Sequence, residues 1–158
     1  MADKRLELAY DAAQKALAMQ DATLGNFRTR ANNLLATAAL FTTFSTAVGL
    51  INTDEDKGPV LPAWGAFLLL LVLLFLAFFV LRVLWPEENW PYGPSAKEIL
   101  ARCDAGDDED AVRKYVTDKM IEGLASNRTK LESRQNSFKL AALLLVVEVV
   151  LLVALLAF

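Results

Sequence analysis

The sequence contains no histidine and a single cysteine, and both features narrow the functions open to it. Without histidine, the usual Cys/His zinc sites and histidine-based catalytic triads cannot form. The lone Cys103 excludes an internal disulfide framework. The sequence also lacks a Gly-rich phosphate loop and a G-x-S-x-G motif. We therefore expect no enzyme, no metal site and no resident cofactor.

A basic excess is missing as well. The chain carries 16 Lys and Arg against 19 Asp and Glu, which gives a formal net charge of -3. Nucleic-acid-binding domains usually concentrate positive charge on one face or along one helix. We therefore expect no nucleic-acid partner.

Long apolar runs are what the sequence has in abundance. Residues 31–53 and 58–81 contain no charged side chain, and residues 138–158 contain only Lys139 and Glu148. Each run reaches the roughly 20 residues that a helix needs to cross a bilayer. Trp64 and Trp85 bracket the middle run, as the aromatic belts of a membrane span do. The sequence predicts an all-α integral membrane protein with three transmembrane helices over 31–53, 63–85 and 138–158.

The distribution of Lys and Arg predicts the orientation. Residues 1–30 and 86–137 are rich in Lys and Arg, whereas the short loop after the first span has only Lys57. Because basic loops stay inside, we expect a cytoplasmic N-terminus and a C-terminus outside. The middle span is Leu, Val and Phe almost throughout, so we expect it to be the lipid-facing wall.

Both cytoplasmic parts are predicted to be helices that continue the spans. The first and third spans therefore extend into a cytoplasmic helical bundle. Residues 1–30 form an amphipathic arm with a heptad seam. In the 86–137 insert, Ser95 with Glu98 predicts a capping box for a short helix through Cys103. The acidic run 107–110 predicts the start of a helix of some fifty residues; the alternative is a calcium loop. The arm's seam comprises Tyr10, Ala13, Leu17, Gln20, Leu24, Phe27, Ala31 and Leu34, and the insert's apolar stripe comprises Val112, Val116, Met120, Leu124 and Leu131.

One carboxyl group lies in the middle of an apolar run. Glu148 is at the centre of the third span, where an ionised carboxylate costs about 2.5 kcal/mol or more. We expect it to face hydroxyl groups of the first span, and two interpretations remain open. Either Glu148 lines a pore or proton path in an oligomer, or it is protonated and only ties the helices together. The candidate hydroxyl partners are Thr42, Ser45 and Thr46.

Basic and amide side chains cluster where the arm and the last helix enter the membrane. Facing one another, they would form a pocket suited to a phosphate group. The alternative is anchoring of these cations to anionic lipid. The candidate residues are Arg28, Arg30, Asn32, Asn33, Arg128, Lys130 and Arg134.

The layout resembles the Pycsar transmembrane effector family over nearly the whole chain. The strongest local match lies in residues 30–35, where a basic residue and Ala are followed by two variable positions and Leu-Leu. Residues 127–131 match in the type of residue more than in identity. The resemblance implies a homo-oligomeric bacterial inner-membrane effector of antiphage defence that impairs membrane integrity. It further implies activation by cyclic UMP or cyclic CMP from a partner cyclase. The sequence has no separate cyclic-nucleotide-binding domain, so such a ligand would bind the helical cytoplasmic part.

Two other functions stay open at this point. A membrane-anchored adaptor or regulatory subunit would use its cytoplasmic helices to hold a soluble partner. A small ion channel or transporter would conduct without any signal.

Overall fold

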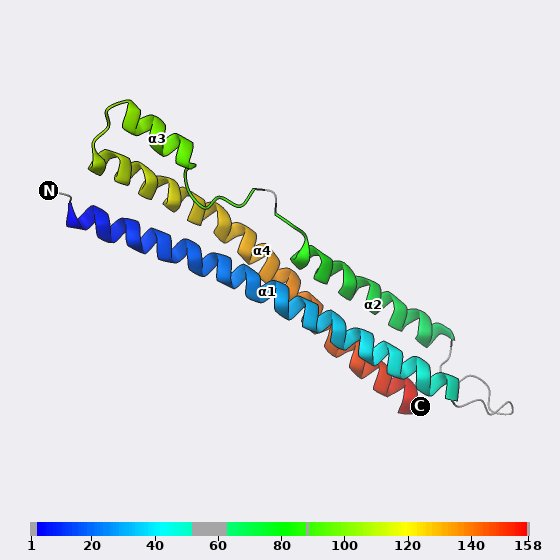
Figure 1. The fold of residues 1–158 in the computed structure, drawn as a ribbon. Helices are drawn as coiled ribbons and strands as arrows, with labels where there is room; N and C mark the ends of the chain where they lie inside the picture. The colour runs from blue at the N-terminus through cyan, green and yellow to red at the C-terminus, as the bar shows by residue number, and fades with distance from the viewer. Residues whose placement is uncertain (1–2, 52–62, 88, 158) are drawn as a thin grey trace. The chain divides into compact units, whose positions relative to one another are not determined.

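A computed structural model describes residues 3–51, 63–87 and 89–157, with side chains left out for 45–51 and 156–157. The described residues form four helices and no strand, which confirms the all-α fold class (Figure 1). The helices are α1 (Lys4–Ile51), α2 (Ala63–Leu84), α3 (Ala96–Asp104) and α4 (Glu109–Ala157). The fourth has 49 residues, in agreement with the predicted helix of some fifty.

The chain divides into two compact units. Unit 1 comprises Met1–Asn26 and Pro86–Ser133, and unit 2 comprises Phe27–Trp85 and Arg134–Phe158. Helices α1 and α4 each contribute residues to both units.

In unit 1, the predicted seams of α1 and α4 pack against each other. Ala13 and Leu17 of α1 and Val116 and Met120 of α4 form a buried cluster. Because residues three and four apart lie on one helix face, these seams bury apolar side chains while leaving the charged faces in solvent. The amphipathic pattern is therefore confirmed for these segments. Partly buried side chains around the cluster are Tyr10, Ile99, Val112, Tyr115 and Leu124.

The two helix starts in the insert follow the local sequence signals. The Ser95 hydroxyl accepts a hydrogen bond from the Glu98 backbone N–H, and the Glu98 carboxylate accepts one from the Ser95 N–H. This reciprocal pair is the predicted capping box. Gly106 has a φ of +89°, a conformation that glycine adopts without strain, and it separates α3 from α4. The Asp108 carboxylate then accepts from the Ala111 N–H at 2.7 Å and caps α4.

In unit 2, α2 packs with the unit 2 segments of α1 and α4 around one apolar cluster. Leu76, Val80 and Val83 of α2 have no exposed surface. One face of α2 therefore belongs to the core, whereas most of its other large side chains are exposed, and the lipid-facing wall stays a prediction. The other helices contribute mostly small residues, which allow close approach. These are Ala31, Leu34 and Ala38 of α1 and Ala141 of α4.

The described part of the chain has two helices long and apolar enough to cross a membrane. They are α2 and the apolar part of α4. The first predicted span, residues 31–53, begins in α1 and ends outside the described residues, so three spans stay a prediction. All but five of the exposed large hydrophobic side chains in the described part belong to unit 2; the five in unit 1 are Leu8, Met19, Tyr92, Leu100 and Ile121.

Candidate functional site

Glu148 is the carboxyl group that the sequence singles out, and it is buried inside unit 2. Its side chain lies on α4 and the residue is only 2% exposed. The Thr42 hydroxyl of α1 lies 3.1 Å from Glu148 Oε1. The other oxygen, Oε2, is buried and has no hydrogen-bond partner among the described residues. The structure thus brings together Glu148 and Thr42 as predicted, while the side chains of Ser45 and Thr46 lie outside the described residues.

Thr42 contacts two acceptors with one hydroxyl proton. Its Oγ1 lies 3.0 Å from the Ala38 carbonyl oxygen and 3.1 Å from Glu148 Oε1. A threonine hydroxyl donates one hydrogen bond but accepts others. Two arrangements therefore fit this geometry: Thr42 donates to an ionised Glu148, or it donates to Ala38 and accepts from a protonated Glu148.

Arg134 lies on α4, also in unit 2, and binds the end of α2. It is 6% exposed, and its guanidinium donates to the carbonyl oxygens of Val83 at 2.7 Å and Trp85 at 2.9 Å. The last carbonyls of a helix have no partner within the helix and carry the negative end of its dipole. A buried cation with several donors gives these carbonyls hydrogen-bond partners and offsets the negative end of the dipole. Arg134 therefore acts here as a cap for α2.

In unit 1, two polar residues of α4 bind the segment that follows α2. The buried Asn127 amide donates to the Pro91 carbonyl at 3.0 Å. The Lys130 ammonium lies 3.1 Å from the Glu87 carboxylate and also donates to the Asn89 carbonyl. These contacts hold Glu87, Asn89 and Pro91 against α4. Of the predicted phosphate-binding cations, Lys130 is one that already has an anionic partner.

The remaining predicted ligand residues fall in both units. Arg128, in unit 1, pairs with Glu132 at 3.0 Å on the exposed surface. The other four belong to the unit 2 part of α1. Arg28 is half-buried and its Nε has no partner among the described residues, whereas Arg30, Asn32 and Asn33 are exposed.

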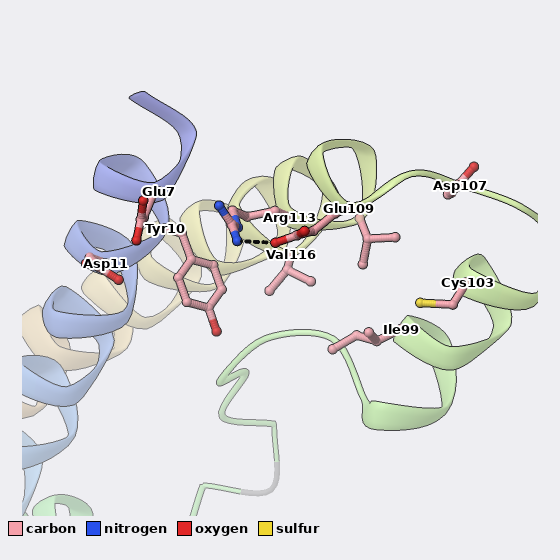
Figure 2. Close-up of a pocket in the computed structure, with 10 residues that line it drawn as sticks. Glu7, Tyr10, Asp11, Ile99, Cys103, Asp107, Glu109, Arg113 and Val116 are labelled. Atoms are coloured by element: carbon pink, nitrogen blue, oxygen red, sulfur yellow. Dashed lines mark hydrogen bonds and ion pairs between the residues drawn. The ribbon is translucent and has the colours of Figure 1, made fainter. Parts of the chain in front are cut away.

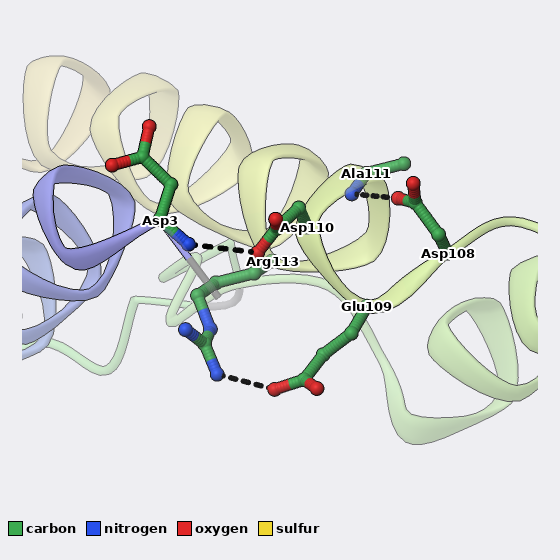
Figure 3. A network of polar contacts seen from close by, with 6 residues as sticks. All are labelled: Asp3, Asp108, Glu109, Asp110, Ala111 and Arg113. Atoms are coloured by element: carbon green, nitrogen blue, oxygen red, sulfur yellow. Dashed lines mark hydrogen bonds and ion pairs between the residues drawn. The ribbon is translucent and has the colours of Figure 1, made fainter. Parts of the chain in front are cut away.

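The acidic run 107–110 is used for helix starts and ion pairs. Asp107 pairs with Arg102 at 3.1 Å, and Glu109 pairs with Arg113 at 2.6 Å. Asp110 accepts from the Asp3 backbone N–H, as Figure 3 shows beside the Asp108 cap. In the part of the chain that was described, no group of three or more metal-ligating side chains is placed to hold an ion. The helix-start interpretation is confirmed.

The roles of Asn127 and Arg134 in fixing the chain after α2 were not predicted. Their spacing of seven residues from Met120 indicates that both positions lie on the buried face of α4, but it does not indicate which group each side chain binds. That spacing is the heptad period of a helix seam. The buried series is Met120, Asn127, Arg134, Ala141, Glu148 and Leu155.

Comparisons with protein-family models, curated proteins and solved structures find no match to this chain. Over the described residues, fold and site together define a class: an all-helical protein with two helices long and apolar enough to span a membrane and a buried carboxyl group in one of them.

Proposed function

We propose that this protein is a membrane-embedded effector that impairs membrane integrity when a small ligand binds its helical part outside the bilayer. The observation that carries the proposal is Glu148. A buried carboxyl group in a helix able to cross a membrane is costly, and such residues commonly serve ion or proton pathways or helix association.

The exposed surface of unit 2 supports the membrane location. Trp64 and Trp85, at the two ends of α2, are 62% and 68% exposed, and the exposed residues between them are mostly Leu and Phe. An apolar surface that runs along a whole helix is rarely exposed to water in soluble monomers, whereas lipid tails can cover it. Exposed tryptophans at both ends of a span match the position of the headgroup regions.

The carboxyl group would act in one of two ways. In an oligomer, copies of Glu148 would gather at an axis and line a pore, because three helices of one chain enclose no aqueous channel. Alternatively, Glu148 would tie α1 to α4 through Thr42 and release them when the helices shift. Both versions lead to membrane damage on activation.

The ligand that the family resemblance suggests is cyclic UMP or cyclic CMP made by a partner cyclase in an antiphage system of the bacterial inner membrane. Its phosphate would bind Arg128 and Lys130, two cations of α4 that both belong to unit 1. On Lys130, a phosphate would replace the Glu87 carboxylate and so loosen the attachment of Glu87 and Asn89 to α4. Because α1 and α4 continue from unit 1 into unit 2, a change in their packing would reach Glu148.

Dye release from liposomes tests this proposal. The purified protein is reconstituted, and cyclic UMP, cyclic CMP, cyclic AMP and cyclic GMP are added in turn. We expect release with one of the pyrimidine nucleotides and loss of that response in an Arg128→Ala, Lys130→Ala double variant. The control is Lys114→Ala, an exposed cation of α4 outside the candidate set. Release that needs no ligand would instead indicate a channel or transporter.

The variant Glu148→Gln distinguishes the pore from the hydrogen-bonded tie. It keeps a side chain of similar shape that can hydrogen-bond to Thr42, but it removes the charge. Loss of release in this variant supports a charged pore, and full release supports the hydrogen-bonded tie.

A membrane-anchored adaptor is the second candidate, favoured by an unfilled groove in unit 1 that is described below. If the folded, inserted protein releases no dye with any of the nucleotides or without them, the effector proposal is overturned and the adaptor is supported.

A further inference from the structure

Unit 1 contains an open groove that no described part of the chain fills. The groove has a volume of about 640 Å³ and lies between the first turns of α1, the helix α3 and the start of α4, as Figure 2 shows. Its apolar side chains come from all three helices. They are Tyr10, Ile99, Val112 and Val116.

The groove continues along α1. A second cavity of about 430 Å³ shares Tyr10, Ile99 and Val116 with the first, and it adds Leu17 and Met120 to the apolar lining. We call the two cavities together the trough. On α1 the trough extends from Glu7 to Asp21, about 21 Å at the rise of an α-helix. Near Asp21, the Tyr92 hydroxyl donates to its carboxylate at 3.1 Å and bridges the trough.

The charges around the apolar lining are almost all negative. Four carboxylates border the first cavity, and Figure 2 places them on α1, α4 and the loop before α4. Arg113 is the one cation among the lining residues, and Figure 3 shows it bound to Glu109. Asp107 is paired with Arg102 and Glu109 with Arg113, so the negative charge beside the apolar floor that no described cation pairs with is that of Glu7 and Asp11. The four carboxylates belong to Glu7, Asp11, Asp107 and Glu109.

We propose that the trough binds a basic amphipathic segment of a partner protein. Apolar side chains of that segment would cover Ile99 and Val116 and pack on the Tyr10 ring, while its Lys and Arg side chains would pair with Glu7 and Asp11. This is the recognition mode in which an amphipathic segment lays its apolar face into a groove. Charge complementarity would set the orientation of the segment and exclude acidic partners.

A small cation alone does not explain this surface, because its apolar side chains, such as Ile99 and Val116, give a metal no ligand. The proposal is independent of the effector function, since every residue it uses belongs to unit 1 and none of them is a candidate for nucleotide binding or for the membrane site.

The test uses the full chain in nanodiscs of neutral phosphatidylcholine. The probe is a fluorescent synthetic peptide of Leu and Lys at helical amphipathic spacing, and its binding is followed by fluorescence anisotropy. A peptide with Glu in place of Lys and empty nanodiscs serve as controls. The groove variant is Glu7→Gln with Asp11→Asn, both exposed positions on α1. The matched variant, Asp104→Asn with Asp118→Asn, removes the same charge from exposed positions of unit 1 outside the trough.

Cys103 provides a second readout, because it is the single cysteine, is exposed and lines the first cavity. A bound peptide should slow alkylation of Cys103 by N-ethylmaleimide. We expect saturable binding of the Lys peptide, protection of Cys103, and about tenfold weaker binding to the groove variant than to the matched variant.

Four outcomes would overturn the proposal. The first is equal affinity of the two variants, which would indicate nonspecific attraction. The second is binding without protection of Cys103, and the third is no saturable binding at all. The fourth is a change in subunit number caused by the groove variant in the absence of peptide, which would assign the trough to a second copy of this chain.

Discussion

The guanidinium of Arg134 donates a 2.7 Å hydrogen bond to the carbonyl oxygen of Val83, in the last turn of α2. The same group reaches the Trp85 carbonyl, so one buried cation of α4 satisfies two carbonyl groups at the end of α2. Arg134 thereby determines where the chain leaves α2, and it couples the position of this end to α4.

Replacing Arg134 by Ala should destabilise the protein. The variant leaves buried carbonyl groups without a donor, at a cost of about 2 to 3 kcal/mol. Thermal unfolding in detergent micelles measures the effect. Arg128→Ala is the matched control, because that side chain is 79% exposed and its pair with Glu132 should contribute less than about 0.5 kcal/mol. Equal stability of the two variants would show that Arg134 does not cap α2.

Thr42→Val should lower stability by about 1 kcal/mol, since it removes the hydroxyl that contacts Glu148. Thr43→Val is the control, because that exposed hydroxyl donates to the Ala39 carbonyl of its own helix and has no contact with Glu148 among the described residues. The two variants are compared by thermal unfolding. The comparison is repeated in a Glu148→Leu background. If the two threonine variants then have equal stability, the cost of Thr42→Val comes from the Glu148 contact; an unchanged difference would contradict this.

Gly65 and Gly25 should respond differently to alanine. A Cβ at Gly65 would lie 2.7 Å from Leu155 Cδ2, whereas one at Gly25 meets nothing within 4 Å. Gly25→Ala should stabilise α1 by about 0.5 to 1 kcal/mol, and Gly65→Ala should lose most of that gain because Leu155 must move. Adding Leu155→Ala to Gly65→Ala provides the check: the clash term should vanish in the double variant, and a strictly additive result would contradict the close approach.

Ser95→Ala should loosen α3 without unfolding the protein. The variant removes the hydroxyl that accepts from the Glu98 N–H, and loss of such a cap costs about 1 kcal/mol. Amide hydrogen exchange of residues 96–104 should accelerate about fivefold. Lys97→Ala, an exposed substitution within the same helix, should leave the exchange unchanged. Acceleration spread over α4 as well would mean that α3 is not a separate capped unit.

Much of the fold could be predicted because its signals are local. The spacing of Ala13 and Leu17 and the pair of Ser95 and Glu98 act through neighbours three or four residues away, and both patterns appear in the structure as expected. The contact of Glu148 with Thr42 was also predictable, since a carboxyl group in an apolar span needs a polar neighbour at similar depth.

The roles of Arg134 and Lys130 could not be predicted in the same way. Read alone, they resemble a phosphate-binding or lipid-anchoring cluster, because sequence shows charge but not the partner that neutralises it. Their partners in the structure lie more than 40 residues earlier in the chain: Lys130 pairs with Glu87, and Arg134 donates to Val83. The face of α2 that joins the core was hidden for a similar reason, since Leu76 and Val80 lie in a run that is apolar on every side.

By itself, then, the sequence determined the helices, their seams and the position of a costly carboxyl group. Helical periodicity and capping are decided within a few turns, and the cost of an isolated charge in an apolar run needs no knowledge of the fold. Tertiary structure alone decided which cations bind backbone carbonyls, which face of α2 is buried, and that α1, α3 and α4 leave an acidic trough open. These features depend on contacts between segments distant in sequence, where packing rather than local pattern selects the partner.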